Sequence, residues 1–220
     1  MPEHPTHHPL VRDLLARCTF PPAGTAVTCA VSGGADSSAL LVLAVAAGCQ
    51  ATAVHVDHGL RPGSADEAAV VRQLAQAVGA DVRCVAVSVG DGPNLEARAR
   101  AARYAALPAD VLTGHTADDQ AETVLVNLLR GAGTSGLAGM RPDHRRPMLA
   151  LRRSDTVELC AALGITSVAD PSNLDPRHLR NRVRHELLPL MADLAHRDLV
   201  PVLARQAQVL RHDDDLLDQL

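Results

Sequence analysis

The sequence contains no tryptophan, one tyrosine and one phenylalanine among its 220 residues. Its core must therefore consist mainly of leucine, valine and alanine, and the hydrophobic content of 47% is sufficient for an ordinary buried core. The sequence also contains no lysine, because all 21 basic residues are arginine. This absence excludes three kinds of site: a phosphate-binding loop that depends on lysine, a Schiff base and a lysine nucleophile.

Cysteine pairs are also missing. The five cysteines are scattered and none forms a Cys-x-x-Cys pair, so the sequence indicates neither a paired-cysteine zinc site nor a redox motif. An odd number of cysteines without a signal peptide leads us to expect a cytoplasmic location. The apolar run 39–47 is too short to cross a membrane, so we expect no membrane partner.

Charge is unevenly distributed along the chain. The net charge is −4, but residues 141–185 hold nine arginines and five acids, which gives +4. The remainder holds twelve arginines and twenty acids, which gives −8. A basic segment of this kind is a candidate for contact with phosphate groups, including those of a nucleic acid, although the whole chain is acidic.

Short β-branched runs alternate with helical patterns over the first 130 residues. Strands are predicted over 25–31, 51–57, 82–87 and 110–114, and helices over 37–47, 64–80, 94–107 and 117–129. This alternation predicts an α/β fold, a Rossmann-like parallel sheet with helices on both faces. Ligands in such sheets bind at the carboxyl ends of the strands. A short edge strand is predicted at 145–149 and helices over 154–163, 183–195 and 198–218, so a C-terminal helical segment follows the sheet.

The stretch AVSGGADSSALL (30–41) lies between the first strand and the first helix. Gly33 and Gly34 permit a close backbone approach, so N–H groups and the helix dipole could be directed at an anion. Ser32 and Ser37 add hydroxyl donors. Asp36 would repel phosphate unless a cation lay between them, which points to ATP with Mg²⁺. The alternative is an ordinary strand-to-helix turn with Asp36 as the helix cap.

Several motifs together carry a family resemblance. The hexapeptide SGGADS resembles the PP-loop of the N-type ATP pyrophosphatases, which bind the pyrophosphate portion of ATP. With HVDHGLR (55–61), the block 114–140, RPML (146–149), DPSN (170–173) and RNRVR (180–184), the chain resembles the tRNA(Ile)-lysidine synthetases over about residues 25–190. The resemblance implies a PP-loop catalytic domain over 1–150, extending to about 190. It further implies that 191–220 is a helical linker and that the family's further C-terminal tRNA-binding domain is absent.

The reaction that the resemblance implies uses ATP, Mg²⁺, free L-lysine and tRNA(Ile) with a CAU anticodon. ATP adenylates the wobble cytidine and releases diphosphate. The ε-amine of lysine then displaces AMP, and the tRNA changes from methionine to isoleucine specificity. The alternative is another PP-loop adenylating ligase that acts on a different tRNA base or on a small molecule. Oligomeric state is not indicated, and a homodimer is left open.

The resemblance also assigns roles to residues. Asp36 and His115 are the expected catalytic residues, and Asp36 the expected metal ligand. The expected ATP contacts are Ser32, Gly33, Gly34, Ala35, Asp36, Ser37, His58 and Arg61. Asp119 and Glu122 are expected to bind lysine. The expected tRNA or phosphate contacts are Arg130, Arg146, Arg180, Arg182 and Arg184.

Structural alternatives exist for several of these residues. Thr116 and Asp119 have the spacing of a capping box, so Asp119 could serve only the helix start. His55, in the same motif as His58, could be an ordinary buried strand residue. The RNRVR segment could be a solvated charged helix, in which Arg180 and Arg184 would share a face that Arg182 does not.

Overall fold

The computed structural model of the chain describes residues 4–57, 64–87, 98, 101–102, 105–168 and 175–219. The chain divides into two compact units. Unit 1 comprises Met1–Gly114 and Asp143–Ala169, and unit 2 comprises His115–Pro142 and Asp170–Leu220. The sequence predicted a catalytic domain that extends to about residue 190 and a helical linker after it. The two compact units do not test that prediction.

Unit 1 is built on a parallel sheet in the order β1-β2-β3, formed by β1 (Ala26–Ala30), β2 (Gln50–Asp57) and β3 (Asp81–Ala86). Ala26 pairs with Gln50 and Thr52 pairs with Asp81. Alternate residues of β2 enter different clusters. Ala51 and Ala53 join the main core, whereas Val54 packs with Leu107 and Val111. A strand places successive side chains on opposite faces, so the central strand β2 packs against a hydrophobic cluster on each face of the sheet. The predicted α/β class is therefore confirmed.

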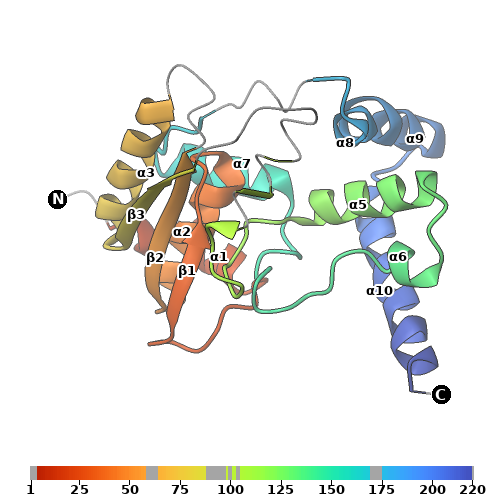
Figure 1. Ribbon diagram of the computed structural model, residues 1–220, viewed down its shortest axis with the longest axis horizontal. Coiled ribbons are helices and arrows are strands. Elements are labelled where there is room, and N and C mark those ends of the chain that lie inside the picture. The colour runs from red at the N-terminus through yellow and green to blue at the C-terminus, as the bar shows by residue number, and fades with distance from the viewer. Residues whose placement is uncertain are drawn as a thin grey trace. The chain divides into compact units, whose positions relative to one another are not determined.

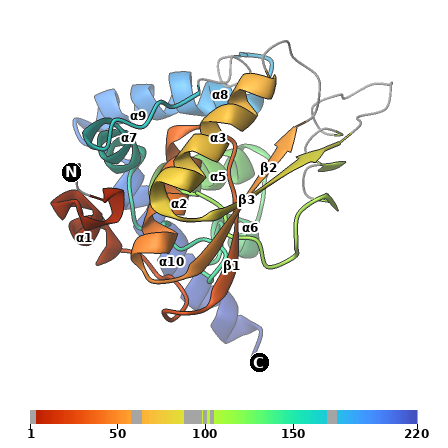
Figure 2. The same ribbon diagram turned by 90° about the vertical axis from the view of Figure 1, so that its left-hand side faces the viewer.

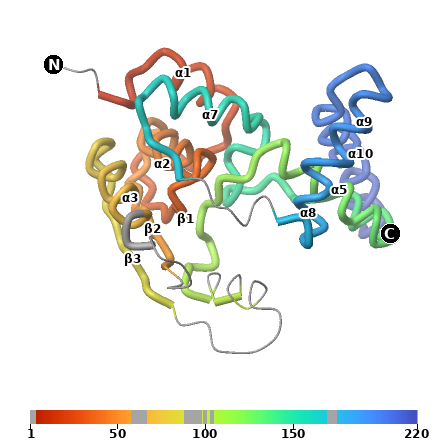
Figure 3. Tube along the Cα trace, turned by 90° about the horizontal axis from the view of Figure 1, so that it is seen from above, coloured from red at the N-terminus to blue at the C-terminus, as the bar shows by residue number. Residues whose placement is uncertain are grey.

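Helices α2 (Ala35–Ala46) and α3 (Ser64–Val78) pack against each other and on the sheet (Figure 2). The short η1 (Pro5–His7) leads into α1 (Pro9–Leu15), and α1 packs with α7 (Arg153–Ala162) and α2 (Figure 3). The predictions for 37–47, 64–80 and 154–163 are thus confirmed within a few residues at each end. The helix predicted over 94–107 lies mostly outside the described residues.

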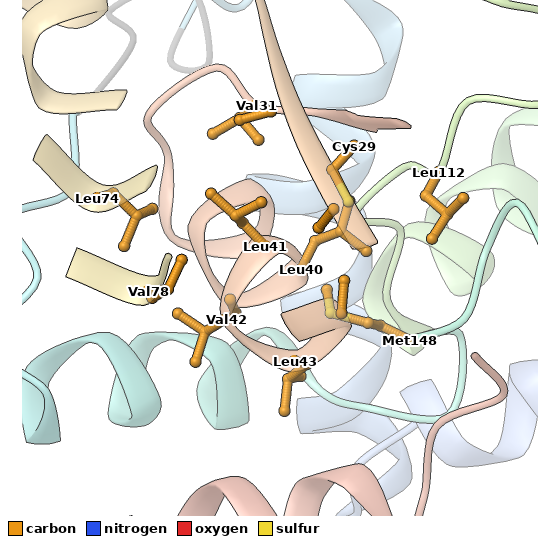
Figure 4. Close-up of a cluster of buried hydrophobic side chains, with 14 of the residues drawn as sticks. Cys29, Val31, Leu40, Leu41, Val42, Leu43, Leu74, Val78, Leu112 and Met148 are labelled. Atoms are coloured by element: carbon orange, nitrogen blue, oxygen red, sulfur yellow. The ribbon is translucent and has the colours of Figure 1, made fainter. Parts of the chain in front are cut away.

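Helix α2 is the centre of the core. Its residues 40–43, Leu-Leu-Val-Leu, are all 0% exposed (Figure 4). Successive helical residues are about 100° apart, so four buried neighbours cover the whole circumference. This explains why the segment is apolar without an amphipathic period: the sheet, α1, α3 and α7 all contact it. The start of α2 is thereby held firmly at the end of β1.

The fourth predicted strand, 110–114, is wrong as a strand. Among the described residues, Leu112 makes only an isolated parallel bridge to Cys29, with its N–H on Thr28 O and its carbonyl accepting from Ala30 N. The pairing stops because Thr113 N donates to Arg145 O at 2.8 Å instead. Leu112 nevertheless lies beside β1, which has β2 on its other side. The sheet therefore grows in one direction from β1 to β2 and β3, and in the opposite direction from β1 to the segment that contains Leu112. Such a switch point in strand order is where open α/β sheets bind ligands.

The edge strand predicted at 145–149 is also wrong, since this segment forms turns. Arg146 N donates to Asp143 O and Leu149 N donates to Arg146 O, both of which are turn bonds. Pro147 has no N–H to donate to a sheet ladder.

Unit 2 is helical. Helix α5 (Ala117–Leu129) and the short α6 (Thr134–Leu137) both pack on α10 (Val200–Leu217) (Figure 1). Helix α8 (Leu179–Arg182) runs through a π-helical turn, η3 (Val183–Leu187), into α9 (Leu188–Ala195). The predictions for 117–129, 183–195 and 198–218 are confirmed as helices, but the π-turn was not predicted. In the described part of the chain, no helix combines the length and the hydropathy needed to cross a bilayer.

Candidate active site

The loop between β1 and α2 has the conformation that an anion site requires. Gly33 has φ +90°, a left-handed conformation that side chains disfavour, and a Cβ there would lie 3.2 Å from Val168 Cγ2. Gly33 O accepts a hydrogen bond from Val168 N, which fixes the loop. The N-cap residue is Gly34, which has no side chain to accept from the first N–H groups of α2. The first turn of α2 thus directs backbone N–H groups and the positive end of the helix dipole at the loop, an arrangement that favours an anion.

The two serines of the loop form one hydroxyl pair. Ser37 Oγ donates to Gly34 O at 2.9 Å and accepts from Ser32 N at 3.1 Å. The Oγ atoms of Ser32 and Ser37 are 3.2 Å apart. Ala35, the first residue of α2, supplies backbone only. The predicted ATP-binding residues from Ser32 to Ser37 therefore lie together in one compact turn.

Asp36 is not the helix cap, because Gly34 occupies the N-cap position. Its carboxylate is held by two side chains of α7: Thr156 Oγ1 donates to Oδ1, and Arg153 Nε donates to Oδ2 at 3.3 Å. Arg153 brings a cation to the loop, which has none of its own. Thr156 is 0% exposed, so the hydroxyl that orients Asp36 is fixed in the core.

Asp36 remains chemically suited to Mg²⁺. Each carboxylate oxygen accepts one of these bonds, and carboxylate oxygens are ligands that Mg²⁺ prefers. Mg²⁺ in nucleotide sites is commonly bound by one or two carboxylates together with phosphate oxygens. The described residues contain no group of three or more His, Cys, Asp or Glu side chains that could hold a metal alone. A metal bound here would therefore depend on phosphate oxygens for most of its ligands other than Asp36.

Gly114 fixes the approach of the next segment to the loop. A Cβ at this position would lie 2.6 Å from Asp36 O and 3.1 Å from Ser37 N. Only glycine lets the backbone pass this close to the start of α2. Gly114 itself is thus positioned, within unit 1, against the loop between β1 and α2.

In unit 2, Thr116 and Asp119 form the capping box that their spacing allows. Asp119 Oδ2 accepts from Thr116 N at 2.9 Å and from Thr116 Oγ1 at 3.1 Å. His115, directly before the cap, is half-buried. The cap uses only one oxygen of Asp119, so the structural role and a binding role can coexist.

The second oxygen of Asp119 belongs to a larger group that we call the acid–arginine cluster. Its members are Asp119, Glu122, Arg180 and Arg184. Arg180 bridges the acids, with Nε 2.8 Å from Glu122 Oε2 and Nη2 3.0 Å from Asp119 Oδ1. Arg184 forms a fork on Glu122, with Nε 2.6 Å from Oε1 and Nη2 2.9 Å from Oε2. The cluster therefore joins the residues predicted for lysine with two that were predicted for phosphate or tRNA.

The other predicted arginines make different pairings. Arg182 is exposed and pairs with Glu186 at 3.0 Å, so the expected division of faces within RNRVR is found. Arg130 is an exposed residue at the C-cap of α5. In unit 1, Arg146 Nη1 is 3.1 Å from Asp143 Oδ2. Burial raises the pKa of Asp143, but Arg145 and Arg146 outweigh that effect and the pKa is lowered.

Residues His58 and Arg61 lie outside the described residues. His55, in the same motif, is 2% exposed and its Nδ1 is 3.0 Å from Val31 O. His55 is therefore a buried strand residue whose contact supports the backbone at the start of the loop.

Three polar side chains were missed by the sequence analysis. Arg153 and Thr156 hold Asp36, and the 8%-exposed Arg211 of α10 donates to Ala138 O and Met140 O. Burial lowers the pKa of Arg211. Its two bonds fix the glycine-rich segment that follows α5. Arg211 could have been found from the sequence, because it falls among the apolar positions of the α10 pattern. No pattern in the sequence pointed to Arg153 or Thr156.

Comparison with known proteins gives consistent similarities. The PP-loop domain family matches residues 10–191. A tRNA(Ile)-lysidine synthase of Nocardia farcinica is 46% identical over 210 residues, covering 91% of this chain and 66% of that protein. A tRNA(Ile)-lysidine synthase of Mycolicibacterium paratuberculosis is 50% identical over 205 residues, covering 87% and 62%. The chain thus spans less than two thirds of the length of these relatives.

Among solved structures, the U34-tRNA thiolase NcsA from Methanococcus maripaludis, with its [4Fe-4S] cluster, superposes with a TM-score of 0.63. The match covers 92% of this chain and 79% of that one at 15% sequence identity. At this identity the likeness concerns the fold alone.

Proposed function

The chain belongs to the PP-loop domain family, and from this premise we propose that it is the catalytic part of a tRNA(Ile)-lysidine synthase. The observation that carries the proposal is identity of 46–50% over about nine tenths of the chain to synthases of that name. The matched span includes both the glycine-serine loop of unit 1 and the acidic pair of unit 2.

The proposed reaction has two steps. First, O2 of the wobble cytidine in the CAU anticodon attacks the α-phosphate of ATP, and diphosphate leaves. Second, the ε-amine of free L-lysine attacks C2, the C2–O bond breaks, AMP leaves and the nitrogen loses a proton. The product tRNA has isoleucine instead of methionine specificity.

The residues of the loop would serve the first step. Its backbone N–H groups and the hydroxyls of Ser32 and Ser37 would bind the phosphates of ATP. Asp36 would hold Mg²⁺, which when bound supplies the positive charge that a carboxylate beside phosphates needs. We expect His115 to contact the reacting groups near the α-phosphate.

The acidic residues would serve the second step. Lysine is cationic, and carboxylates form strong charge-assisted hydrogen bonds with ammonium groups. Asp119 and Glu122 supply them. The exposed arginines Arg130 and Arg182 could contact tRNA phosphates, and such contacts would make tRNA binding weaken as salt increases.

We also infer a cytoplasmic location. All five cysteines are free thiols, and Cys29, Cys49 and Cys160 are buried as thiols. Free thiols persist in a reducing compartment, which supports this proposal. A homodimer stays a prediction.

The proposal is tested by diphosphate release with each combination of ATP, lysine and tRNA(Ile) transcript. We expect release to require ATP and the CAU transcript, to stop with EDTA and to resume with Mg²⁺. AMP should then be released only when lysine is added. A transcript with uridine at the wobble position is the control.

Diphosphate release that ignores the tRNA would overturn this proposal in favour of a ligase that acts on a small molecule. Release with another tRNA but not with this one would favour a different modified base. ATP binding without release in any combination would instead indicate a binding module.

A further inference from the structure

We propose that His55 is a positioning residue for ATP. Its buried ring sets the orientation of the peptide from which the glycine-serine loop of unit 1 begins, and thereby the affinity of that loop for ATP. The inference rests on the proposed function, because it takes the loop to bind the phosphates of ATP. It adds a residue that lies outside the loop, on the neighbouring strand β2.

The carbonyl of Val31 lies where the pairing of β1 with β2 ends. The last pair of the ladder is Ala30 with Val54, and Val31 N still donates to Val54 O at 2.9 Å. Among the described residues, the carbonyl of Val31 accepts its hydrogen bond from a side chain instead, His55 Nδ1 at 3.0 Å. Val31 is 2% exposed, and a buried carbonyl without a donor is costly. His55 therefore supplies a bond that the sheet does not.

The peptide that joins Val31 to Ser32 is held from two opposite sides. In a trans peptide, the C=O and N–H groups point in opposite directions within one plane. His55 Nδ1 donates to the carbonyl of this peptide, and its N–H donates to Ser37 Oγ at 3.1 Å. Neither bond belongs to the sheet ladder, so two side chains determine how this peptide is oriented.

The hydrogen bonds continue from this peptide into the loop. Ser37 Oγ donates to Gly34 O at 2.9 Å, and Ser32 Oγ lies 3.2 Å from Ser37 Oγ. Ser37 is buried, whereas Ser32 is exposed. A rotation of the peptide before Ser32 would displace the side chain of Ser32 and remove a donor from Ser37. Both serines belong to the groups that we propose bind phosphate, so the orientation of this peptide bears on ATP affinity.

The ring of His55 acts through one of its two nitrogens. A carbonyl oxygen only accepts hydrogen bonds, so Nδ1 carries a proton. Nε2 is buried and makes no hydrogen bond to any of the described residues. The ring lies on the face of β2 that also presents Ala51 and Ala53 to the main core. The bond from Nδ1 to the Val31 carbonyl therefore accounts for a histidine at a position that is otherwise apolar.

Two amide substitutions separate the roles of the nitrogens. Asparagine places its amide nitrogen at the position of Nδ1, whereas glutamine places it at the position of Nε2. We expect His55→Asn to bind ATP with Mg²⁺ as the parent chain does. His55→Gln should bind it roughly 3- to 10-fold more weakly, the range for loss of one neutral hydrogen bond. Isothermal titration calorimetry of the full chain with ATP and Mg²⁺ measures both, and equal affinity of His55→Gln and the parent would overturn the proposal.

Ala53→Gly is the matched control for a general loss of stability. Ala53 lies on the same face of β2, is 0% exposed and pairs in the ladder with Cys29 of β1. Its substitution removes packing from the core without removing a bond to the Val31 carbonyl. Urea denaturation measures how far each variant is destabilised. We expect Ala53→Gly to bind ATP like the parent chain, and weakening of ATP binding in proportion to lost stability in both variants would overturn the proposal.

A double-variant cycle tests whether His55 acts through this peptide. Ser37→Ala removes the acceptor for Ser32 N and so releases the opposite side of the same peptide. Residues that hold one group show coupled effects, so the losses of ATP affinity in His55→Gln and Ser37→Ala should not simply multiply in the combined variant. Losses that do multiply would show that the two side chains act independently, which would also overturn the proposal.

Failure of the proposed function is distinguishable from failure of this inference. ATP binding is measured without tRNA and without lysine, so its dependence on His55 is read whether or not diphosphate release requires tRNA(Ile). If ATP binds but tRNA-dependent release is absent, only the proposed function falls. If release occurs and His55→Gln binds ATP like the parent, only this inference falls. If the parent chain does not bind ATP, both fall.

Discussion

Asp36 illustrates how one carboxylate can be held in a loop that we propose binds phosphate. Thr156 and Arg153 bind its two oxygens from α7, so its position is set by a helix far away in sequence. The Asp36 and Arg153 side chains are 26% and 27% exposed, so their pairing contributes at most about 1 kcal/mol to stability. We expect Arg153 instead to orient the Asp36 carboxylate and to balance its charge.

A substitution at Thr156 separates these effects. Thr156→Val keeps the shape and removes the hydroxyl that donates to Asp36. We expect ATP-dependent diphosphate release to fall roughly tenfold, as for loss of a hydrogen bond to a charged group, with the far-ultraviolet circular dichroism unchanged. Ser154→Ala, on the exposed side of α7, is the control and should behave as the parent chain. Equal activity of Thr156→Val and the parent would refute an orienting role for Thr156.

At the scale of elements, the start of α2 is fixed from several sides. The loop contacts Val168, α7 binds Asp36, and the backbone at Gly114 passes against Asp36 O. The segment 110–114 therefore lies beside β1 as a strand would and supports the start of α2, although it makes only one bridge among the described residues.

Gly114→Ala tests this close approach. The added Cβ would lie 2.6 Å from a backbone oxygen, which cannot move without shifting α2. We expect the free energy of unfolding to fall by about 1–3 kcal/mol, as in other overpacked sites, and the affinity for ATP to fall with it. Urea denaturation and ATP titration provide the two measurements. Gly133→Ala is the matched control, because Gly133 has nothing within 4 Å of such a Cβ, and similar losses in both variants would contradict the argument.

At the scale of the whole molecule, a core made almost entirely of aliphatic residues encloses cysteine thiols. Cys29 is 0% exposed. Burial, together with nearby Cys49, raises the pKa of Cys29 from 9.0 to about 12. The folded protein therefore retains this proton at a pH at which the unfolded chain loses it.

The sign of the resulting pH dependence follows from this difference. The stability linked to Cys29 is fully present below pH 9 and is lost as the pH rises towards about 12. We expect the free energy of unfolding to decline in this window by up to about 1.4 kcal/mol per pH unit from this thiol. Urea denaturation at a series of pH values measures the slope. Cys29→Ala should have a smaller slope, and an identical slope would show that other groups cause the decline.

Much of unit 1 could be predicted from the sequence alone. β-branched runs, helical spacing and paired glycines act over a few residues, so they determined the strands β1–β3, the helix α2 and the loop between them. The same reasoning proposed the capping box at Thr116 and the common face of Arg180 and Arg184. It failed at 110–114 and 145–149, where bonds between Thr113 and Arg145 replace ladder pairing.

Only the tertiary structure decided which charges meet. Arg153 and Asp36 are 117 residues apart, and Arg184 and Glu122 are 62 apart. No local pattern encodes such pairs, because burial of the intervening helices brings them together. The loop's missing lysine is a property of the sequence, whereas the arginine that accompanies its carboxylate comes from the packing of α7 on α2.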